Sequence, residues 1–576
     1  MAKKNSKNKK RGGGSNSNSS SKKTASSSSN SKETKSTTPP FEKALSGSSQ
    51  TKLGSSWQAL GTVIVVAIAI FVKDFYLPQR LRGTNGSDAG HVEGSGDPMN
   101  ACTAVMSNSS FPDGGWGMFL LKDIPRGTPV SDGDVVIPVP EVTGVQYAAI
   151  KHFLHAYMWH SDVGGGLNEG HVVHSVISGV GSLLNGNPVY YNVAPQPGSA
   201  VDNAGVSRVY SPGAGAFTHY HGMKYFSVKH LMPGDELLLD YGKSWAAKLP
   251  ETTHIDPSYI QSKPVESLKE HGVCTDHIYP GMSTLAHAGR GALASRFLPK
   301  GTVVAPAPLI PIFGRIGLDL GKDRPQQLLL NYCFGHPNSS LLLFPYAPVV
   351  NLINHHPQHA NVEVRWSNSS LHYSKHLLNK PIDAIQESPF GLLMEFVATH
   401  DIQEGEEVLL NYGEAWHEAF QQHVMDWKPT VDETFQYADE LNRELTELRT
   451  EEELLYKPYP GHVRTTCFYE FDPNRVATGG PVRWETSQRI SQLSNQYPCR
   501  IHKRDFDEYT VEILNREDIA SQQQRPIPPG HTVKNVPRRA IRITEKMHTS
   551  DQHLKNAFRH EIGVPDGVFP TAWMDL

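Results

Sequence analysis

An internal repeat with a period of about 170 residues constrains this chain more than any other feature of its sequence. Three blocks occur twice in the same order: a Gly-x-Gly loop, two asparagines seven residues apart, and a Gly-[Asp/Glu]-Glu run that ends in Tyr-Gly. The first set lies at 115–117, 185–192 and 234–242, and the second at 289–291, 354–361 and 405–413. Ordered blocks at matched spacing predict two copies of one domain. We expect a first segment at 99–248 and a second segment at 270–420.

The stretches around these blocks favour short β-strands. Residues 303–312 are rich in β-branched residues and proline, and the runs 341–344 and 407–410 are apolar and flanked by turn residues. Residues 326–331 are compatible with a short helix. Long helices do not alternate with these strands, so the pattern predicts a β-rich domain rather than βαβ units. The 576 residues suffice for three or four folded units.

The remainder of the chain is predicted to form two further parts. Residues 421–458, within which 431–455 is dense in Glu and Leu, are predicted to form an acidic helical segment. Residues 459–576 are predicted to form an α+β module with strands over 500–514 and a short helix near 551–562. No chemistry can be assigned to this module from its sequence. Five cysteines do not make a disulfide framework, although Cys467 and Cys499 could pair.

The N-terminal part differs sharply in charge from the rest. Residues 1–56 carry twelve basic and two acidic residues, a net charge of +10, whereas the whole chain carries −4 and the other 520 residues therefore carry −14. This Lys-, Ser- and Asn-rich tail is predicted to be disordered, because it lacks the apolar surface that offsets ordering entropy. Residues 57–72 contain no charge. We predict a transmembrane signal-anchor helix over 57–77, followed by a linker over 78–98.

The distribution of basic residues predicts the orientation of this span. Basic residues lie mostly before it, which predicts a cytosolic tail and a lumenal body, as in a single-pass type II membrane protein. Four Asn-x-Ser sequons follow the span and add weak support for a glycoprotein: Asn85, Asn108, Asn338 and Asn368. The competing interpretation is a docking helix, which would leave a nuclear or cytosolic protein. The basic tail is read as a topology signal, and direct binding of nucleic acid is not expected.

The second set of blocks resembles the SET domain. The resemblance rests on Gly-x-Gly, on Asn-His followed by Pro and Asn, and on Gly-Glu-Glu-Val-x-x-x-Tyr-Gly. It covers 270–420 well and the first segment more loosely. It implies small, curved β-sheets with a pseudoknot, and a protein-lysine methyltransferase that uses S-adenosylmethionine and acts on a lysine side chain of a protein substrate.

The resemblance also assigns residues of the second segment. It implies that the cofactor contacts Gly289, Arg290, Gly291, Asn354 and His355, and that Tyr412 is the catalytic tyrosine. The glycines suit this role, since a residue without Cβ lets a ligand approach the backbone closely. A neutral lysine amine then attacks the methyl group in line, so catalysis depends mainly on alignment. No metal is expected, because no carboxylate or cysteine completes a site with the nearby histidines.

The sequence also departs from the family pattern. One extra residue separates Asn354 from Asn361, Asn411 stands where Asp is common, and no Cys-x-Cys cluster follows Tyr412. Another C-terminal segment must therefore close the lysine channel, and the helix predicted over 431–455 is one candidate. The first segment has Gly186 in place of His. It is read as a degenerate partner of the second segment, although two active sites remain possible.

The sequence therefore predicts a membrane-anchored, tandem SET-like protein-lysine methyltransferase. Two alternatives stay open: a non-catalytic SET-like interaction protein of the secretory pathway, and a soluble nuclear or cytosolic SET methyltransferase.

Overall fold

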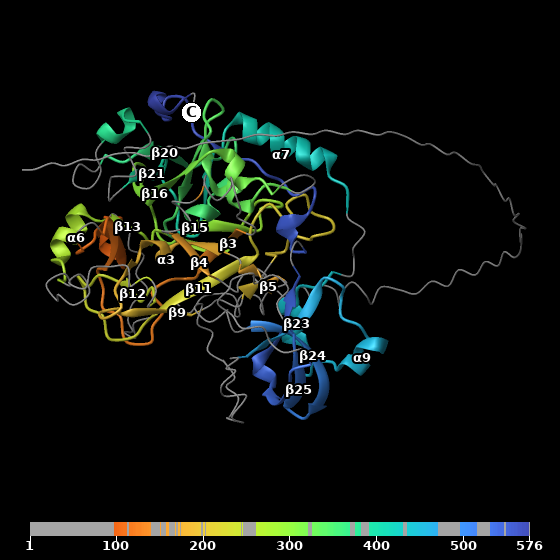
Figure 1. Cartoon of the computed structure of the whole chain (residues 1–576). Coiled ribbons are helices and arrows are strands. Elements are labelled where there is room, and N and C mark those ends of the chain that lie inside the picture. Colours follow the sequence, from red (N-terminus) through yellow and green to blue (C-terminus); the bar gives the residue numbers. More distant parts are fainter. Residues whose placement is uncertain are drawn as a thin grey trace, which may run out of the picture. The chain divides into compact units, whose positions relative to one another are not determined.

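The computed structural model describes residues 97–574 with internal gaps. The gaps are 112–113, 140–149, 151–156, 161–166, 169–170, 173, 197–199, 202, 243–244, 246–260, 321–324, 369–374, 382–390, 430–434, 470–495, 515–529 and 547–548. Strands predominate over helices in the described residues, as predicted (Figure 1). The predicted tail, the predicted span at 57–77 and most of the predicted linker lie outside them.

Two larger sheets are built mainly on strands of the first segment, although β13 of the first sheet comes from the start of the second segment. One has the strand order β13-β1-β2 and the other has the order β10-β11-β3-β7-β4, with β9 also paired to β11. Their bounds are β1 (Ala104–Asn108), β2 (Trp116–Leu120), β3 (Asp134–Val139), β4 (Met158–His160), β7 (His174–Ser178), β9 (Val193–Gln196), β10 (Ala200–Val201), β11 (Tyr220–Ser227) and β13 (Val273–Cys274). Every residue of β2 and β3 is buried, including one carboxyl group, Asp134 at the start of β3. β8 (Asn185–Gly186) pairs in parallel with β12 (Leu238–Leu239).

The second segment is built on one large sheet with the order β14-β15-β22-β20-β21-β16-β18-β17-β28, in which β19 also pairs with β22. The strands are β14 (Ile278–Met282), β15 (Arg290–Ala294), β16 (Val303–Phe313), β17 (Phe334–Gly335), β18 (Leu341–Pro345), β19 (Asn354–His355), β20 (Val362–Trp366), β21 (Leu392–Ala398), β22 (Glu407–Leu410) and β28 (Ile562–Gly563). The helix expected at 326–331 is a 3-10 helix, Leu328–Tyr332. The last strand comes from near the C-terminus and pairs in parallel with β17.

A further five-stranded sheet has the order β26-β25-β24-β23-β27 (Figure 1). Its strands are β23 (Val463–Phe468), β24 (Gln496–Asp505), β25 (Glu508–Ile513), β26 (Thr532–Pro537) and β27 (Ile541–Glu545). β24 and β25 confirm the strands predicted over 500–514.

Two helix predictions in the C-terminal part need correction. The stretch at 431–455 contains two short helices, α8 (Ala438–Glu444) and α9 (Glu451–Tyr456), because Thr450 caps a new helix start through a reciprocal bond with Glu453. The helix predicted near 551–562 is wrong. That stretch has a 3-10 turn, Asp551–His553, and then runs without helix into β28, whose backbone bonds to β17.

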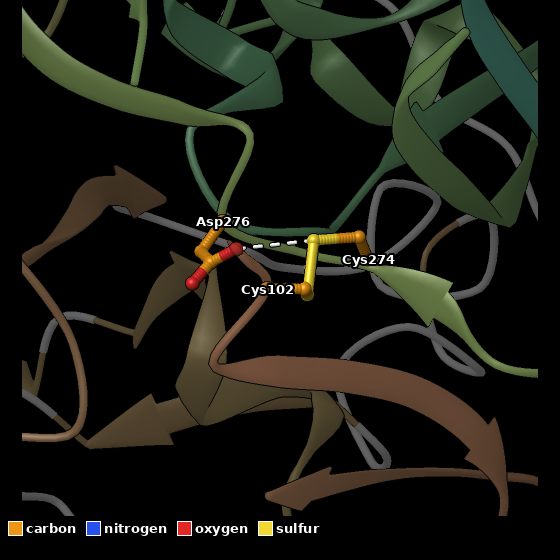
Figure 2. Close-up of side chains that lie close together, drawn as sticks. All are labelled: Cys102, Cys274 and Asp276. Carbon is orange, nitrogen blue, oxygen red and sulfur yellow. Dashed lines mark hydrogen bonds between the residues drawn. A yellow bond between two sulfur atoms is a disulfide. The ribbon is translucent and has the colours of Figure 1, made fainter. Parts of the chain in front are cut away.

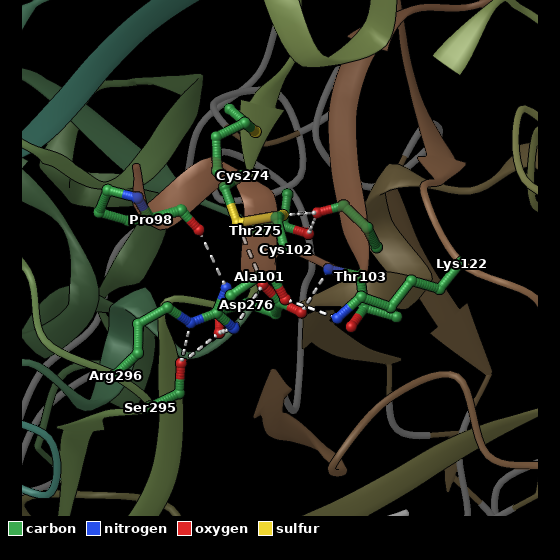
Figure 3. Close-up of a disulfide and its surroundings, with 12 residues drawn as sticks. Pro98, Ala101, Cys102, Thr103, Lys122, Cys274, Thr275, Asp276, Ser295 and Arg296 are labelled. Atoms are coloured by element: carbon green, nitrogen blue, oxygen red, sulfur yellow. Dashed lines mark hydrogen bonds and ion pairs between the residues drawn. A yellow bond between two sulfur atoms is a disulfide. The ribbon is translucent and has the colours of Figure 1, made fainter. Parts of the chain in front are cut away.

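Two disulfides are present among the described residues. Cys467–Cys499 joins β23 to β24, and Cys102–Cys274 links the approach to β1 with β13, across 172 residues of sequence. Asp276 lies beside the second pair (Figure 2). Its carboxylate accepts hydrogen bonds from the Thr103 backbone N–H and from Arg296 (Figure 3). Because both sulfur atoms are bonded to each other and the carboxylate is paired, this cluster is a covalent crosslink rather than a metal site.

The sequence predicted a single-pass type II membrane protein, and the observed helices do not support this prediction. None of the helices in the described residues is long and apolar enough to cross a membrane. The longest, α7 (Glu414–Asp426), has 13 residues, whereas a span requires about 20 apolar ones. Residues 57–77 themselves lie outside the described part of the chain.

Asp134, the first residue of β3, is a carboxyl group buried in the core of the first segment. It accepts a hydrogen bond from the Gly181 backbone N–H at 2.8 Å. Burial raises the pKa of Asp134 to about 7, against an ordinary value of 3.8, and the backbone N–H donors of Gly181 and Val180 oppose this only partly. The folded state therefore binds this proton more tightly than the unfolded state does.

We expect the stability of the wild type to fall as pH rises from about 4 to about 7, because the folded state must then lose this buried proton. At about 1.4 kcal/mol per pKa unit the loss is on the order of 4 kcal/mol. Asp134→Asn, which mimics the protonated acid, should flatten this part of the profile in urea unfolding at a series of pH values. The exposed Asp240→Asn is the control and should leave the profile unchanged. Equal profiles for wild type and Asp134→Asn would contradict the assignment.

Candidate functional site

A cavity of about 320 Å³ lies in the second segment and brings together four of the residues predicted to form a site. They are Arg290, Asn354, His355 and Tyr412. Three further regions contribute to its walls: Phe217 of the first segment, Trp416, His417 and Phe420 on α7, and Phe558 and Ile562 near the C-terminus. The volume is at the lower end of the range of small-molecule sites, about 300–1,000 Å³.

The two predicted glycines flank Arg290 in the sequence but are not among the residues that line the cavity, and each makes room for another part of the protein. A Cβ on Gly291 would collide with the carboxylate of Glu407. Gly289 has φ +73°, and a Cβ there would lie 2.7 Å from the ring of Phe217. The sequence predicted a ligand in the space beside these glycines, whereas the side chains of Glu407 and Phe217 occupy at least part of it.

The Glu407 carboxylate is buried and held by a set of short-range donors. Ser283 donates its hydroxyl at 2.7 Å, the Thr284 backbone N–H donates at 2.7 Å, and the Asn354 amide donates at 3.1 Å. The same Asn354 amide donates to the Arg290 carbonyl at 2.7 Å. A buried charge needs such partners, because desolvation without them is costly. Asn354 therefore joins β19 to β15 and β22 through its side chain.

The first segment contains the same arrangement around Glu236. Ser109 donates its hydroxyl at 2.7 Å, the Ser110 N–H donates at 2.8 Å, and the Asn185 amide donates to this carboxylate at 3.3 Å and to the Trp116 carbonyl at 2.9 Å. A Cβ on Gly117 would again meet the carboxylate. The three sequence blocks thus meet at one buried glutamate in each segment.

His355 is held in one orientation between β22 and α7. Its Nδ1 accepts the Tyr412 backbone N–H at 2.9 Å, so in the neutral ring the proton lies on Nε2, which is 3.0 Å from Nδ1 of His417. Burial lowers the pKa of His355 to about 4, and His417 and His356 lower it further in the same direction. The ring is therefore neutral near pH 7 and adds no charge to the cavity.

Tyr412 lines the cavity, and its hydroxyl donates to the Ile353 carbonyl. Burial raises the pKa of Tyr412 well above its ordinary value, so the phenol stays protonated. Tyr412 can therefore orient a ligand but cannot serve as a base near neutral pH. Tyr241 of the first segment is held in the same way, donating to the Leu184 carbonyl, and burial raises its pKa likewise.

The first segment differs from the second at the positions that face the cavity. Trp116 is buried in the core where Arg290 of the second segment lines the cavity. A Cβ on Gly186 would lie 2.7 Å from the Tyr241 ring and 3.0 Å from the Trp245 ring. A histidine like His355 would not fit there, which explains the glycine.

Asn331 ties together the walls that come from remote parts of the chain. Its amide donates to the Ala216 carbonyl at 2.7 Å and to the Phe558 carbonyl at 2.9 Å, and its Oδ1 accepts the His560 N–H at 3.0 Å. The C-terminal wall is thus formed by residues 558–562. The helix predicted over 431–455 contributes no residue to the described lining. Sequence reasoning indicated only that some later segment was required.

Comparisons with known proteins give partial likenesses. No protein-family model matches the chain, and no curated protein matches it. Among solved structures, it is similar to a Plasmodium falciparum protein named as a candidate histone methyltransferase, at 20% identity and a TM-score of 0.16, over 24% of this chain and 96% of that one. It is also similar to the Chaetomium thermophilum polycomb repressive complex 2, at 17% identity over 27% of this chain, with a TM-score of 0.18. Another match is ctPRC2 bound to S-adenosylmethionine, at 16% identity over 29% of this chain, with a TM-score of 0.19.

The chain spans less than a fifth of the length of the polycomb chains, 17% and 19% respectively. At TM-scores below 0.2 these likenesses do not place it in a family.

We expect Gly291→Ala to destabilise the protein by about 1–3 kcal/mol, because the new methyl group displaces the buried Glu407 carboxylate. Gly117→Ala should cost a similar amount through Glu236. Gly461→Ala is the control, since a Cβ there meets nothing within 4 Å, and it should change stability by less than about 0.5 kcal/mol. Thermal unfolding of the three variants checks this. A Gly291→Ala protein as stable as Gly461→Ala would contradict the packing argument.

Proposed function

We propose that this protein is an S-adenosylmethionine-dependent protein-lysine N-methyltransferase whose site is the cavity of the second segment. The observation that carries the proposal is the convergence of Arg290, Asn354, His355 and Tyr412 on one cavity. These residues come from three separate blocks of the sequence. Gly289 and Gly291 stand on either side of Arg290 and are proposed to serve the same site through their backbone.

The residues of the cavity fit the proposed cofactor. Arg290 can pair with the carboxylate of its methionine part. Tyr412, Trp416 and Phe420 offer aromatic faces, which attract a cation such as a sulfonium. No Asp or Glu occurs among the described lining residues. One anionic group and one cationic group of the ligand would thus each meet a suitable partner.

The bound cofactor would supply an activated methyl group, and the side chains of the cavity would supply orientation. The Tyr412 hydroxyl is fixed by its bond to the Ile353 carbonyl and presents its oxygen to the attacking amine or the methyl group. The largely apolar walls favour the neutral form of a lysine amine by desolvation. His355 is neutral and therefore adds no positive charge beside the lysine amine. The protein substrate is therefore expected to enter as an uncharged amine.

The first segment is proposed to be a degenerate copy that supports the site without performing chemistry. This is supported by the matched hydrogen bonds at Glu236 and Glu407, by the buried Trp116 and by the packed Gly186. Its own contribution to the cavity is the stretch Ala216, Phe217 and Thr218. We keep 99–248 and 270–420 as the proposed bounds of the two copies.

A non-catalytic SET-like interaction protein is the second candidate function. One observation favours it: the Asn354 amide donates to the Glu407 carboxylate, and Gly291 packs against the same carboxylate. These residues would be retained for folding even if the chemistry had been lost. Intact mass spectrometry after incubation with cofactor and a lysine peptide array separates the two candidates.

We expect the wild type to bind S-adenosylmethionine in calorimetry and to transfer its methyl group to lysine peptides. Tyr412→Phe should retain binding but reduce the transfer rate by about 10-fold or more, because one oriented oxygen is lost. Tyr241→Phe is the matched control. It also removes a buried hydroxyl that donates to a backbone carbonyl, so it should cost similar stability but leave transfer unchanged.

Absence of cofactor binding by the folded wild type would overturn the enzyme proposal. Binding without any methyl transfer would favour the interaction protein instead.

A further inference from the structure

A second cavity, of about 250 Å³, adjoins the first one at Phe558, whose side chain lines both. Its remaining walls come from the end of α7 and the turn after it, and from the C-terminal segment: His423, Asp426, Trp427, Asn556, Ala557 and Arg559. The proposed methyl-transfer chemistry uses none of these six residues. The cavity is therefore a separate feature next to the proposed site.

Trp427 carries a buried donor without an acceptor. Its indole Nε1 is buried, yet it has no hydrogen-bond partner among the described residues. Leaving such a group unpaired costs free energy, so an acceptor on a ligand would be favoured there. His423, one turn earlier, donates its Nε2 proton to the Pro212 carbonyl at 2.8 Å and is fixed by that bond.

The hydrogen-bonding capacity left unused in the cavity favours a cationic ligand over an anionic one. Arg559 donates four of its N–H groups to the carbonyls of Gln326, Gly215, Phe558 and Gln552, so little of its guanidinium is left for a ligand. Asp426 is exposed, and only its Oδ2 has a partner among the described residues, the Gln422 amide at 2.8 Å. Its second oxygen can accept a bond from a cationic group.

We infer that this second cavity binds a basic residue of a peptide that flanks the residue in the first cavity. The Asp426 carboxylate receives the cationic side chain, and the Trp427 indole donates to a backbone carbonyl of the same peptide. Because Phe558 lines both cavities, neighbouring residues of one extended peptide can occupy both. The inference rests on the proposed function for the identity of the occupant, a segment of the protein substrate with Lys or Arg beside the target lysine.

The test uses the full chain and N-acetyl-arginine methylamide as the probe, because arginine is not the amine proposed for the first cavity. Its neutral isostere, N-acetyl-citrulline methylamide, is the control ligand. Calorimetry should give weaker binding of the citrulline compound by about two- to fivefold, the range expected for one exposed ion pair. Asp426→Asn should weaken arginine binding by a similar factor, and Trp427→Phe by about fivefold.

Glu418→Gln is the matched variant, since Glu418 is an exposed carboxylate of the same helix that lines neither cavity, and it should bind like the wild type. The indole N–H resonance that disappears in Trp427→Phe should shift in the wild type when the arginine compound is added. Equal binding of both compounds, an unmoved indole resonance, or equal effects of Asp426→Asn and Glu418→Gln would overturn the inference.

Cofactor calorimetry on the same protein distinguishes the two proposals. Cofactor binding without arginine binding would overturn the second cavity alone, and arginine binding without cofactor binding would overturn the methyltransferase alone.

Discussion

A buried glutamate carboxylate joins the matching positions of the repeat in each segment: Glu236 in the first segment and Glu407 in the second. Both side chains are removed from water, so every lone pair must be met by a donor from the protein. The donors come from the loop before the Gly-x-Gly strand and from the first asparagine of the paired-asparagine block. The second glycine of the Gly-x-Gly loop is required because any Cβ there would meet the carboxylate. One electrostatic requirement therefore links three blocks of sequence that are far apart along the chain.

Because of this requirement, the presence of the three blocks is not by itself evidence of a ligand site. Gly291, Asn354 and Glu407 are needed for the fold whether or not a ligand is ever bound, and Gly117, Asn185 and Glu236 show that the same set persists where the neighbouring space is filled. The information about chemistry lies instead in the positions at which the two segments differ. Arg290 faces a cavity where its counterpart Trp116 is buried, and His355 has a ring where Gly186 has none.

The sequence predicted those parts of the structure that depend on local pattern or on the repeat. It predicted the β-rich character, the strands within 500–514 and four residues that line one cavity, and it left the Cys467–Cys499 pair open. It did not predict the positions of Phe217 and Phe558 or the Cys102–Cys274 bond, because each depends on contacts between segments far apart in the sequence that no local pattern records. The helix predicted near 551–562 is limited to the 3-10 turn Asp551–His553, and the stretch ends in a strand where Ile562 pairs with Phe334.

The position of Asn331 explains why the cavity belongs to the whole chain rather than to the second segment. Its amide joins the carbonyl of Ala216 to that of Phe558, and its oxygen accepts from His560. These bonds hold two walls of the cavity: Ala216, which precedes Phe217, on one side, and Phe558 on the other. Residues 270–420 alone would keep the Glu407 network, which is internal to them, but would lack both aromatic walls. The buried glutamate therefore joins the sequence blocks within each segment, whereas the shape of the cavity depends on the association of the first segment and the C-terminal strand with the second.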